Sequence, residues 1–234
     1  MQEFELNRPV LDFRSKEAFK TLRTNIEFSG NDVKVIALTS ATPNEGKSSI
    51  SFELAIAFAE AGKKTLLIDA DLRKSVMRSR FKRGKINYGF THFLAGIRDA
   101  QEVLCATDIE NLYMIFAGPV PPNPSELLGG ERFRNFIEAC RRDFDIVVID
   151  TSPIGSVIDA AVISKCCDGV AVVMAAGEIS YKFAQRIKDQ LEVANAKVLG
   201  LILNKVSIGT KGYYGKYYGK YYGKYYGNYG DSGN

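Results

Sequence analysis

Six short apolar runs, separated by helical patterns, constrain the fold of this chain more than any other feature of its 234 residues. Each run is continuous rather than alternating, which is typical of strands covered on both faces and therefore of a parallel sheet. Helical patterns fill the intervals 48–61, 124–142 and 180–194. The apolar runs are 35–38, 65–68, 112–116, 146–149, 170–173 and 199–203. The sequence therefore predicts an α/β fold, with a mostly parallel sheet and helices on both faces.

Segments of different character flank this core. Residues 15–28 place Phe19, Leu22 and Ile26 at helical spacing, which predicts an amphipathic helix near the N-terminus. At the other end, a Lys-Tyr-Tyr-Gly repeat covers 216–227, and its glycine-rich composition cannot build a packed core. We therefore predict three parts, namely an N-terminal segment with a helix (1–30), a core domain (31–208) and a flexible tyrosine-rich tail (209–234).

The composition argues against several classes of protein. The formal net charge of +4 comes from 31 basic and 27 acidic residues, so it does not by itself call for a nucleic acid or an anionic membrane. The single histidine, His92, cannot supply a Ser-His-Asp triad or a histidine-based metal site. The N-terminus is acidic and no apolar run approaches the roughly 18 residues that span a bilayer, so we expect a cytosolic protein. Four cysteines without C-x-x-C spacing are expected to be reduced core thiols, namely Cys105, Cys140, Cys166 and Cys167.

A phosphate-binding loop follows the first apolar run. Residues 41–48 read Ala-Thr-Pro-Asn-Glu-Gly-Lys-Ser, which fits the Gly-x-x-x-x-Gly-Lys-Ser pattern with alanine in place of the first glycine. Backbone N–H groups and the following helix N-terminus can surround phosphate oxygens, while Lys47 reaches the β and γ phosphates and Ser48 reaches Mg²⁺. A chance turn is the alternative, but the strand before and the helix after favour the loop. We expect nucleotide contacts from Thr42, Pro43, Asn44, Glu45, Gly46, Lys47, Ser48 and Ser49.

Three aspartates follow two of the apolar runs. Asp69 and Asp71 come after the second run, and Asp150 comes after the fourth. Because ligands bind at the carboxyl ends of strands in an open parallel sheet, we expect the three carboxylates to converge on the edge that carries Lys47. A single aspartate at a strand end is often only a cap or a turn residue. Three beside a phosphate loop instead indicate an active site.

Five segments together resemble those of a known family. The loop at 41–48 looks like its Walker A motif, and Leu-Leu-Ile-Asp-Ala-Asp-Leu-Arg at 66–73 looks like its A-prime motif. The stretch 145–153 is similar to its Walker B strand, 121–128 to its proline-rich segment, and the tail to its tyrosine cluster. The chain thus resembles the bacterial protein-tyrosine kinases of capsule and exopolysaccharide synthesis in Gram-positive bacteria. The resemblance covers nearly the whole chain from Ser15 on, and it implies a P-loop NTPase-type fold that uses ATP and Mg²⁺.

The resemblance implies a role for each residue of the cluster. Lys47 binds the phosphates, and Ser48, Asp71 and Asp150 supply the Mg²⁺ shell. Asp69 receives the substrate tyrosine. A phenol has a pKa of about 10 and an aspartate one of about 4, so Asp69 acts either as a base or by orienting the hydroxyl. Orientation suffices if the phosphoryl group has largely left before the nucleophile attacks.

Further roles follow from the same resemblance. Arg73 is expected near the site as a catalytic residue, and Asn204 matches the position where related ATPases bond adenine, with a strand-terminating turn as its alternative. Glu17, Lys20 and Arg23 lie along one helix stripe, where the family has a Glu-x-x-Arg-x-x-Arg oligomerisation motif. Lysine lacks the planar fork of arginine, so we expect weaker ring assembly here. An ordinary solvated face is the alternative for this stripe.

The tail holds nine of the twelve tyrosines. The resemblance implies that they are phosphoacceptors, and we expect phosphorylation between subunits to make neighbouring tails repel and to loosen the oligomer. Lysine-interleaved aromatics also suit single-stranded nucleic acid, and an inert low-complexity tail is another alternative. The expected phosphoacceptors are Tyr213, Tyr214, Tyr217, Tyr218, Tyr221, Tyr222, Tyr225, Tyr226 and Tyr229.

Partners are also implied by the resemblance. We expect a homo-oligomer in the form of a ring, a separate transmembrane activator and a cognate phosphotyrosine phosphatase, and we expect no nucleic acid. The chain is then cytoplasmic and is recruited by its activator to the inner face of the cell membrane.

Other functions compete with the kinase interpretation. A partitioning or positioning ATPase shares the loop and the strand-end aspartates, but it carries a lysine where this chain has Thr42. A eukaryotic-type kinase is set aside because there is no His-Arg-Asp loop and residues 143–145 read Asp-Phe-Asp rather than Asp-Phe-Gly. A subunit of an export machine, in which ATP only sets the oligomeric state, stays open.

Overall fold

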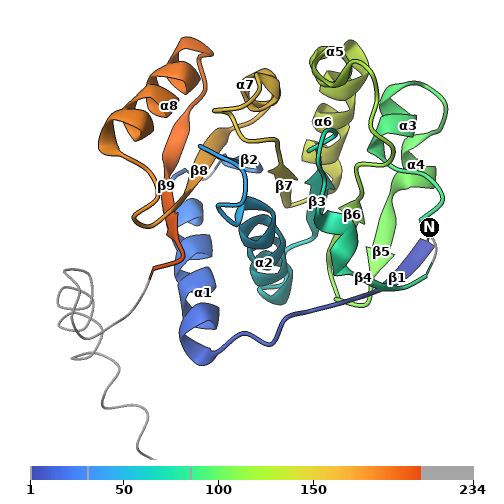
Figure 1. Ribbon diagram of the computed structural model, residues 1–234. Coiled ribbons are helices and arrows are strands. Elements are labelled where there is room, and N and C mark those ends of the chain that lie inside the picture. The colour runs from blue at the N-terminus through green and yellow to red at the C-terminus, as the bar shows by residue number, and fades with distance from the viewer. Residues whose placement is uncertain (1, 31, 85, 207–234) are drawn as a thin grey trace, which may run out of the picture.

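A nine-stranded sheet is the centre of the structure, a computed structural model that describes residues 2–30, 32–84 and 86–206 (Figure 1). The strands lie in the order β4-β1-β5-β6-β3-β7-β2-β8-β9. They pair in parallel except β1 with β4 and β5 with β6, which are antiparallel. The strands are β1 (Gln2–Leu6), β2 (Val35–Ser40), β3 (Thr65–Asp69), β4 (Phe81–Arg83), β5 (Cys105–Thr107), β6 (Leu112–Ile115), β7 (Ile146–Asp150), β8 (Gly169–Ala175) and β9 (Val198–Asn204). This confirms the predicted α/β class with a mostly parallel sheet.

The six apolar runs all form strands of this sheet. Every residue of β2, β3, β7 and β8 is buried, as expected for parallel strands with helices on both faces. Continuous apolar sequence was therefore a sufficient signal for the centre of the fold.

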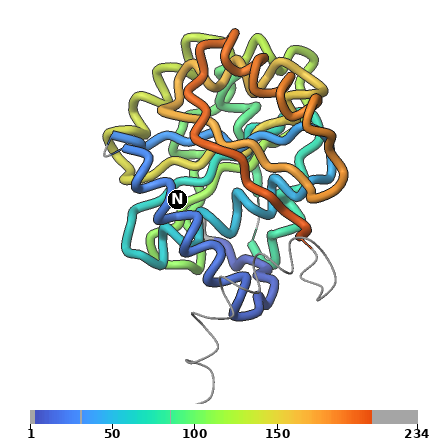
Figure 2. Tube along the Cα trace, turned by 90° about the vertical axis from the view of Figure 1, so that its left-hand side faces the viewer, coloured from blue at the N-terminus to red at the C-terminus, as the bar shows by residue number. Residues whose placement is uncertain are grey.

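Helices cover both faces of the sheet, which Figure 2 shows between two layers of chain. One buried cluster joins the sheet to α1 and α2, and the other joins it to α3 and α5–α8. The helices are α1 (Phe13–Glu27), α2 (Lys47–Glu60), α3 (Phe90–Leu94), α4 (Ala100–Val103), α5 (Pro124–Gly129), α6 (Glu131–Asp143), α7 (Asp159–Ser164), α8 (Tyr181–Val193) and a 3₁₀ turn, η1 (Met77–Arg80).

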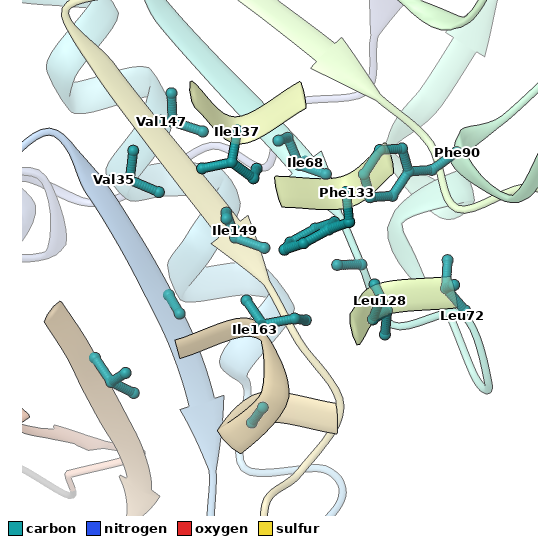
Figure 3. Packing of buried hydrophobic residues seen from close by; sticks show 14 of the residues in the cluster. Val35, Ile68, Leu72, Phe90, Leu128, Phe133, Ile137, Val147, Ile149 and Ile163 are labelled. Atoms are coloured by element: carbon teal, nitrogen blue, oxygen red, sulfur yellow. The ribbon is translucent and has the colours of Figure 1, made fainter. Parts of the chain in front are cut away.

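Aromatic and branched side chains fill the space between the sheet and α6. Phe133 and Ile137 of α6 are fully buried against Ile149 and Ile68 of the central strands (Figure 3). Burying one such side chain contributes about 1.5–3 kcal/mol. This packing covers β3 and β7 next to their carboxyl ends.

The helix predicted over 124–142 is two helices. Gly130 ends α5 and begins α6, and its ψ of 163° is extended rather than helical. The helical pattern continues on both sides of this residue, so periodicity alone did not reveal the break. The two helices pack as separate rods against α7 and against the sheet.

The N-terminal part is more closely joined to the sheet than the sequence indicated. The predicted helix is present as α1, but the five residues of β1 also form a strand, between β4 and β5. Phe4 and Leu6 are buried in the core there. This strand is short and alternates apolar with acidic residues, so it did not match the continuous runs used to find the others.

Several sequence expectations concern the rest of the chain. All four cysteines are free; Cys105 and Cys140 are buried, as expected for core thiols, whereas Cys166 and Cys167 are only partly buried. Within 2–30, 32–84 and 86–206, no helix is long and apolar enough to cross a membrane. The expected phosphoacceptor tyrosines, Tyr213 to Tyr229, lie outside the described residues.

Candidate active site

The strand register brings the predicted acidic residues together. Asp69 and Asp150 are directly opposite each other at the carboxyl ends of β3 and β7. On the other side of β7, Leu38 of β2 is opposite Asp150, and the phosphate loop begins shortly after that strand. The predicted convergence on one edge of the sheet is therefore present.

The loop has the backbone of a phosphate cradle. Asn44 and Gly46 have φ values of 67° and 89°, which turn the chain into the first residue of α2. A Cβ on Gly46 would lie 2.2 Å from the side-chain nitrogen of Asn204, so only glycine fits without movement. The free N–H groups at the start of α2 and its helix dipole then favour an anion in this loop.

Lys47 is the cation at the centre of the cluster. Its side chain is 6% exposed, and its Nζ lies 2.9 Å from Asp150 Oδ1, 3.1 Å from Ser48 Oγ and 3.9 Å from Asp71 Oδ2. Ser51, which the sequence did not single out, donates its hydroxyl to Asp150 Oδ1 at 2.8 Å. One ammonium thus lies between two carboxylates, Asp150 at the end of β7 and Asp71 just after β3.

The oxygens around Lys47 suit a magnesium ion. Mg²⁺ prefers hard oxygen ligands and is usually held by one or two carboxylates together with substrate phosphates. Ser48, Asp71 and Asp150 offer a hydroxyl and two carboxylates around one cation position. In the described part of the chain, no group of three or more histidine, cysteine or acidic residues forms a metal site without such help from a substrate. The predicted Mg²⁺ residues therefore fit the ion in the presence of nucleotide.

Asp71 is held by its neighbours. Its Oδ1 accepts the Ser152 hydroxyl at 2.8 Å and the backbone N–H of Lys74 at 3.0 Å, which leaves Oδ2 toward Lys47. Ser152 follows β7 in the segment that the sequence assigned to Walker B. The orientation of this carboxylate is thus fixed by the segments that follow β3 and β7.

Asp69 differs from the other two aspartates. It is 1% exposed, its Oδ2 accepts the Ser75 hydroxyl and, at 3.4 Å, the backbone N–H of Ala117, and its buried Oδ1 has no partner among the described residues. Burial and the nearby Asp150 raise the pKa of Asp69 to about 7, against the opposing effects of Ser75 and Lys47. A carboxylate with a pKa near neutral and a free oxygen is a suitable proton acceptor.

Glu45 braces the loop from inside. Its carboxylate is buried and accepts the backbone N–H groups of Thr42 at 2.7 Å and of Ala175, at the end of β8, at 3.1 Å. Asn204, at the end of β9, donates its side-chain N–H to the Glu45 carbonyl at 2.8 Å. The Glu45 side chain is thus occupied within the protein, and the adenine contact of Asn204 stays a prediction.

Two arginines lie beside the cluster rather than in it. Arg73 pairs with the fully buried Asp159 of α7 at 2.6 Å and donates to the Ser125 hydroxyl of α5 at 2.9 Å, so it is not brought to Lys47. Arg80 donates to the Ser49 hydroxyl at 2.7 Å, beside the loop. Neither Asp159 nor Ser125 could be found from spacing, because their partner is distant in the sequence.

The predicted oligomerisation stripe makes contacts within the chain. Glu17 and Lys20 form an ion pair of 2.7 Å on α1. Arg23 donates to the backbone carbonyl of Ala57 in α2 at 3.0 Å. An intersubunit role for these residues stays a prediction.

Comparison with known proteins decides the family. The AAA domain family matches residues 33–198. The tyrosine-protein kinase CpsD of Streptococcus agalactiae is 46% identical over 204 residues, which cover 86% of this chain and 89% of that protein. The chain belongs to the bacterial protein-tyrosine kinases.

Solved structures agree with this assignment. The kinase domain of the Escherichia coli tyrosine kinase ETK superposes on this kinase with a TM-score of 0.77 and 31% identity, covering 85% of this chain and 80% of that one. The chimerical protein CapA2B2 gives a TM-score of 0.76 and 34% identity, covering 81% and 84%. The kinase is therefore a nucleotide-dependent enzyme that acts on tyrosine, and the partitioning-ATPase interpretation is set aside.

Proposed function

We propose that this kinase transfers the γ-phosphoryl group of ATP to tyrosines of its own C-terminal tail, and that the tail of one subunit is phosphorylated by another. One observation carries the proposal. Lys47 of the phosphate loop contacts Asp150 and Ser48 and lies near Asp71. The unpartnered oxygen of Asp69 lies on the strand next to that of Asp150. This arrangement provides for both substrates of a phosphoryl transfer.

The residues of the loop would bind the triphosphate. Backbone N–H groups of residues 44–49 surround its oxygens, and the Lys47 ammonium exchanges its Asp150 partner for the β and γ phosphates. Mg²⁺, when held by Ser48, Asp71 and Asp150, neutralises charge on the phosphates and orients them. Asp150 and Asp71 thus stay paired with a cation in the loaded enzyme.

Asp69 would receive the acceptor tyrosine. Its Oδ1 is buried in the nucleotide-free protein, so a shift of the surrounding loops has to expose it. It then accepts a hydrogen bond from the phenol and orients the phenol oxygen toward the phosphoryl group. Burial, which raises the pKa of Asp69 in the nucleotide-free protein, also favours uptake of the phenol proton as the new bond forms. Orientation and proton uptake are then parts of one role.

Assembly and location complete the proposal. Homologous CpsD is a tyrosine-protein kinase by name, and CapA2B2 is a chimerical protein. We propose for this kinase a homo-oligomeric ring that uses α1, a separate transmembrane activator that brings it to the inner face of the cell membrane, and a phosphotyrosine phosphatase that resets the tail. Capsule or exopolysaccharide synthesis and export is the process that this cycle would regulate.

Two full-length variants test the proposal. Lys47→Met keeps the tail but loses the phosphate-binding cation, and a variant with the nine tail tyrosines changed to phenylalanine keeps the site but loses the acceptors. Each protein alone, and the two mixed, are incubated with Mg-ATP and an activator fragment, and phosphotyrosine is mapped by intact mass and peptide fragmentation. We expect phosphate on residues 213–229 of the Lys47→Met protein only in the mixture.

The control and the contradicting outcomes are clear. Lys182→Met, at an exposed position of α8, is expected to behave as the wild type. ATP hydrolysis without phosphotyrosine in the wild type would contradict the autokinase proposal. Phosphate that appears on the wild type but never passes to the Lys47→Met protein would contradict transfer between subunits.

A further inference from the structure

The hydroxyl of Ser75 is aimed at the proposed tyrosine-binding carboxylate. Ser75 lies in the loop between β3 and η1 and donates its hydroxyl to Asp69 Oδ2. The same Oδ2 accepts the Ala117 N–H at 3.4 Å, whereas Oδ1 is buried and has no partner among the described residues. Oδ2 of Asp69 therefore accepts hydrogen bonds within the protein, whereas Oδ1 accepts none from the described residues.

The direction of the Ser75 hydroxyl is fixed by the chain that follows. The backbone N–H of Met77 donates to Ser75 Oγ at 3.2 Å, which uses a lone pair of the oxygen and leaves its hydrogen for Asp69. Met77 is 1% exposed and packs in the core cluster that includes Phe4 and Phe116. A buried anchor therefore holds the donor in place, although the loop itself lies at the surface.

Asp69 cannot be oriented by its remaining contacts alone. The Ala117 N–H makes a long hydrogen bond, and Lys47 acts on Asp69 through its charge rather than through a hydrogen bond. Without Ser75, rotation about the Cβ–Cγ bond could tilt the carboxylate plane and turn Oδ1 away from the substrate. A catalytic group must be held close to its productive geometry, because small displacements reduce the rate strongly.

We propose that Ser75 is a positioning residue of this kinase, which holds Asp69 Oδ2 so that Oδ1 faces the acceptor tyrosine. This inference rests on the proposed role of Asp69. Ser75 touches neither nucleotide nor tyrosine, so its effect passes through Asp69 and concerns the transfer step rather than the binding of ATP.

A double-mutant cycle tests this role in the full-length kinase. The proteins are the wild type, Ser75→Ala, Asp69→Asn and the double variant, and the readouts are the single-turnover rate of tail phosphorylation at saturating Mg-ATP and the affinity for ATP. We expect Ser75→Ala to lower the rate about tenfold to a hundredfold, as other changes behind a functional group do, with the affinity for ATP unchanged. In the Asp69→Asn protein, Ser75→Ala should have no further effect.

Two more variants separate positioning from a general structural role. Ser75→Thr retains the hydroxyl and is expected to restore the rate to within a few-fold of the wild type. Ser79→Ala removes a hydroxyl of the same segment that donates to the Val76 carbonyl at 2.7 Å, and it should leave the rate unchanged. Unfolding midpoints of all variants show that each protein is folded.

The outcomes separate the two proposals. A wild-type or higher rate for Ser75→Ala, beside a strongly reduced rate for Asp69→Asn, would overturn the role of Ser75 and leave that of Asp69 standing. If Ser75→Ala lowers the rate by the same factor in the wild type and in the Asp69→Asn protein, the role of Ser75 is likewise overturned. A fully active Asp69→Asn protein would overturn both.

Discussion

The central strands carry charged side chains at both their amino and their carboxyl ends, here called the amino edge and the carboxyl edge of the sheet, but the surroundings of these charges differ. At the amino edge, Asp168 accepts the N–H groups of Lys34 at 2.8 Å and Val35 at 2.7 Å and both of its oxygens pair with Arg141 at 2.6 Å. At the carboxyl edge, three carboxylates share one ammonium, and Asp69 keeps a buried oxygen without a partner. At the amino edge, both carboxylate oxygens have hydrogen-bond donors and a cation. At the carboxyl edge, negative charge exceeds positive charge.

The pKa values report the same difference. Although burial acts to raise it, the pKa of Asp168 is lowered by the N–H groups of Val35 and Lys34 and by Arg141. Burial and Asp150 instead raise the pKa of Asp69 to about 7. The amino edge therefore stabilises the fold, whereas the carboxyl edge holds unfavourable charge that a bound cation would relieve.

Removing the one ammonium should have the largest effect. Lys47→Met leaves the three carboxylates without a cation, and we expect tail phosphorylation to fall on the order of 10³-fold because an electrostatic contact to the transferred group is lost. The free energy of unfolding should also fall by about 3 kcal/mol, since a buried charge loses its partner. Phosphotyrosine mass spectrometry and urea unfolding measure these effects. Unchanged phosphorylation would show that Lys47 is not the phosphate residue.

A change at the amino edge should affect stability alone. Asp168→Asn loses the pair with Arg141, and we expect the free energy of unfolding to fall by about 2 kcal/mol because the pair is partly exposed. The rate per folded molecule should stay at the wild-type value. Urea unfolding and the phosphorylation rate check this, with Asp189→Asn on α8 as the exposed control. A loss of activity without a loss of stability would contradict the contrast between the edges.

Neutralising Asp69 should stabilise the protein while it strongly lowers the rate of phosphoryl transfer. In the nucleotide-free protein at pH 8, Asp69→Asn removes one of three crowded carboxylates, and we expect the free energy of unfolding to rise by about 1 kcal/mol. Tail phosphorylation should fall to a low residual rate. Urea unfolding at pH 8 gives the stability. A destabilised Asn variant would mean that the carboxyl edge is not short of positive charge.

Asp69 and Asp168 should make the free energy of unfolding depend on pH in opposite directions. The folded pKa of Asp69 is raised above its ordinary 3.8, so its contribution to stability is full below that value and is lost as pH rises toward about 7. The folded pKa of Asp168 is lowered, so its contribution is full above 3.8 and is lost as pH falls through the lowered value. Urea unfolding of the nucleotide-free protein between pH 3 and pH 8, with each Asn variant as reference, measures both. Slopes of the same sign would contradict this account.

Breaking an exposed ion pair should have the smallest effect on the free energy of unfolding. Lys188 and Glu192 on α8 lie 2.7 Å apart and are both about half exposed. We expect Lys188→Gln to lower the free energy of unfolding by at most about 0.5 kcal/mol and to leave the rate unchanged. Urea unfolding in low and high salt checks this. A loss as large as that of Asp168→Asn would show that pairing, rather than burial, explains the amino edge.

The centre of the fold and the site could be predicted because both leave local signals. Buried parallel strands require continuous apolar runs, and a phosphate loop requires Gly46, Lys47 and Ser48 at fixed spacing. Since parallel strands end at one edge, Asp69 and Asp150 could be placed together before any coordinates were known.

The features that escaped prediction depend on contacts between distant parts of the chain. Asp159 is distant in sequence from its partner Arg73. The Ser51 hydroxyl of α2 likewise contacts Asp150 of β7, which is far from it in the sequence. The break at Gly130 also escaped, because the helical period continues across it. No local pattern distinguishes such residues from ordinary polar or glycine positions.

The strand at the very beginning of the chain matters for protein engineering. A shortened version that starts at residue 31, where the sequence divides most naturally, would discard β1 together with the buried Phe4 and Leu6. The edge-to-face contacts of Phe4 with Phe81 and Phe116 would go with it, and β5 would become a bare sheet edge. Fusion partners and affinity tags are therefore best attached ahead of β1 through a linker, and deletions in this region are best avoided.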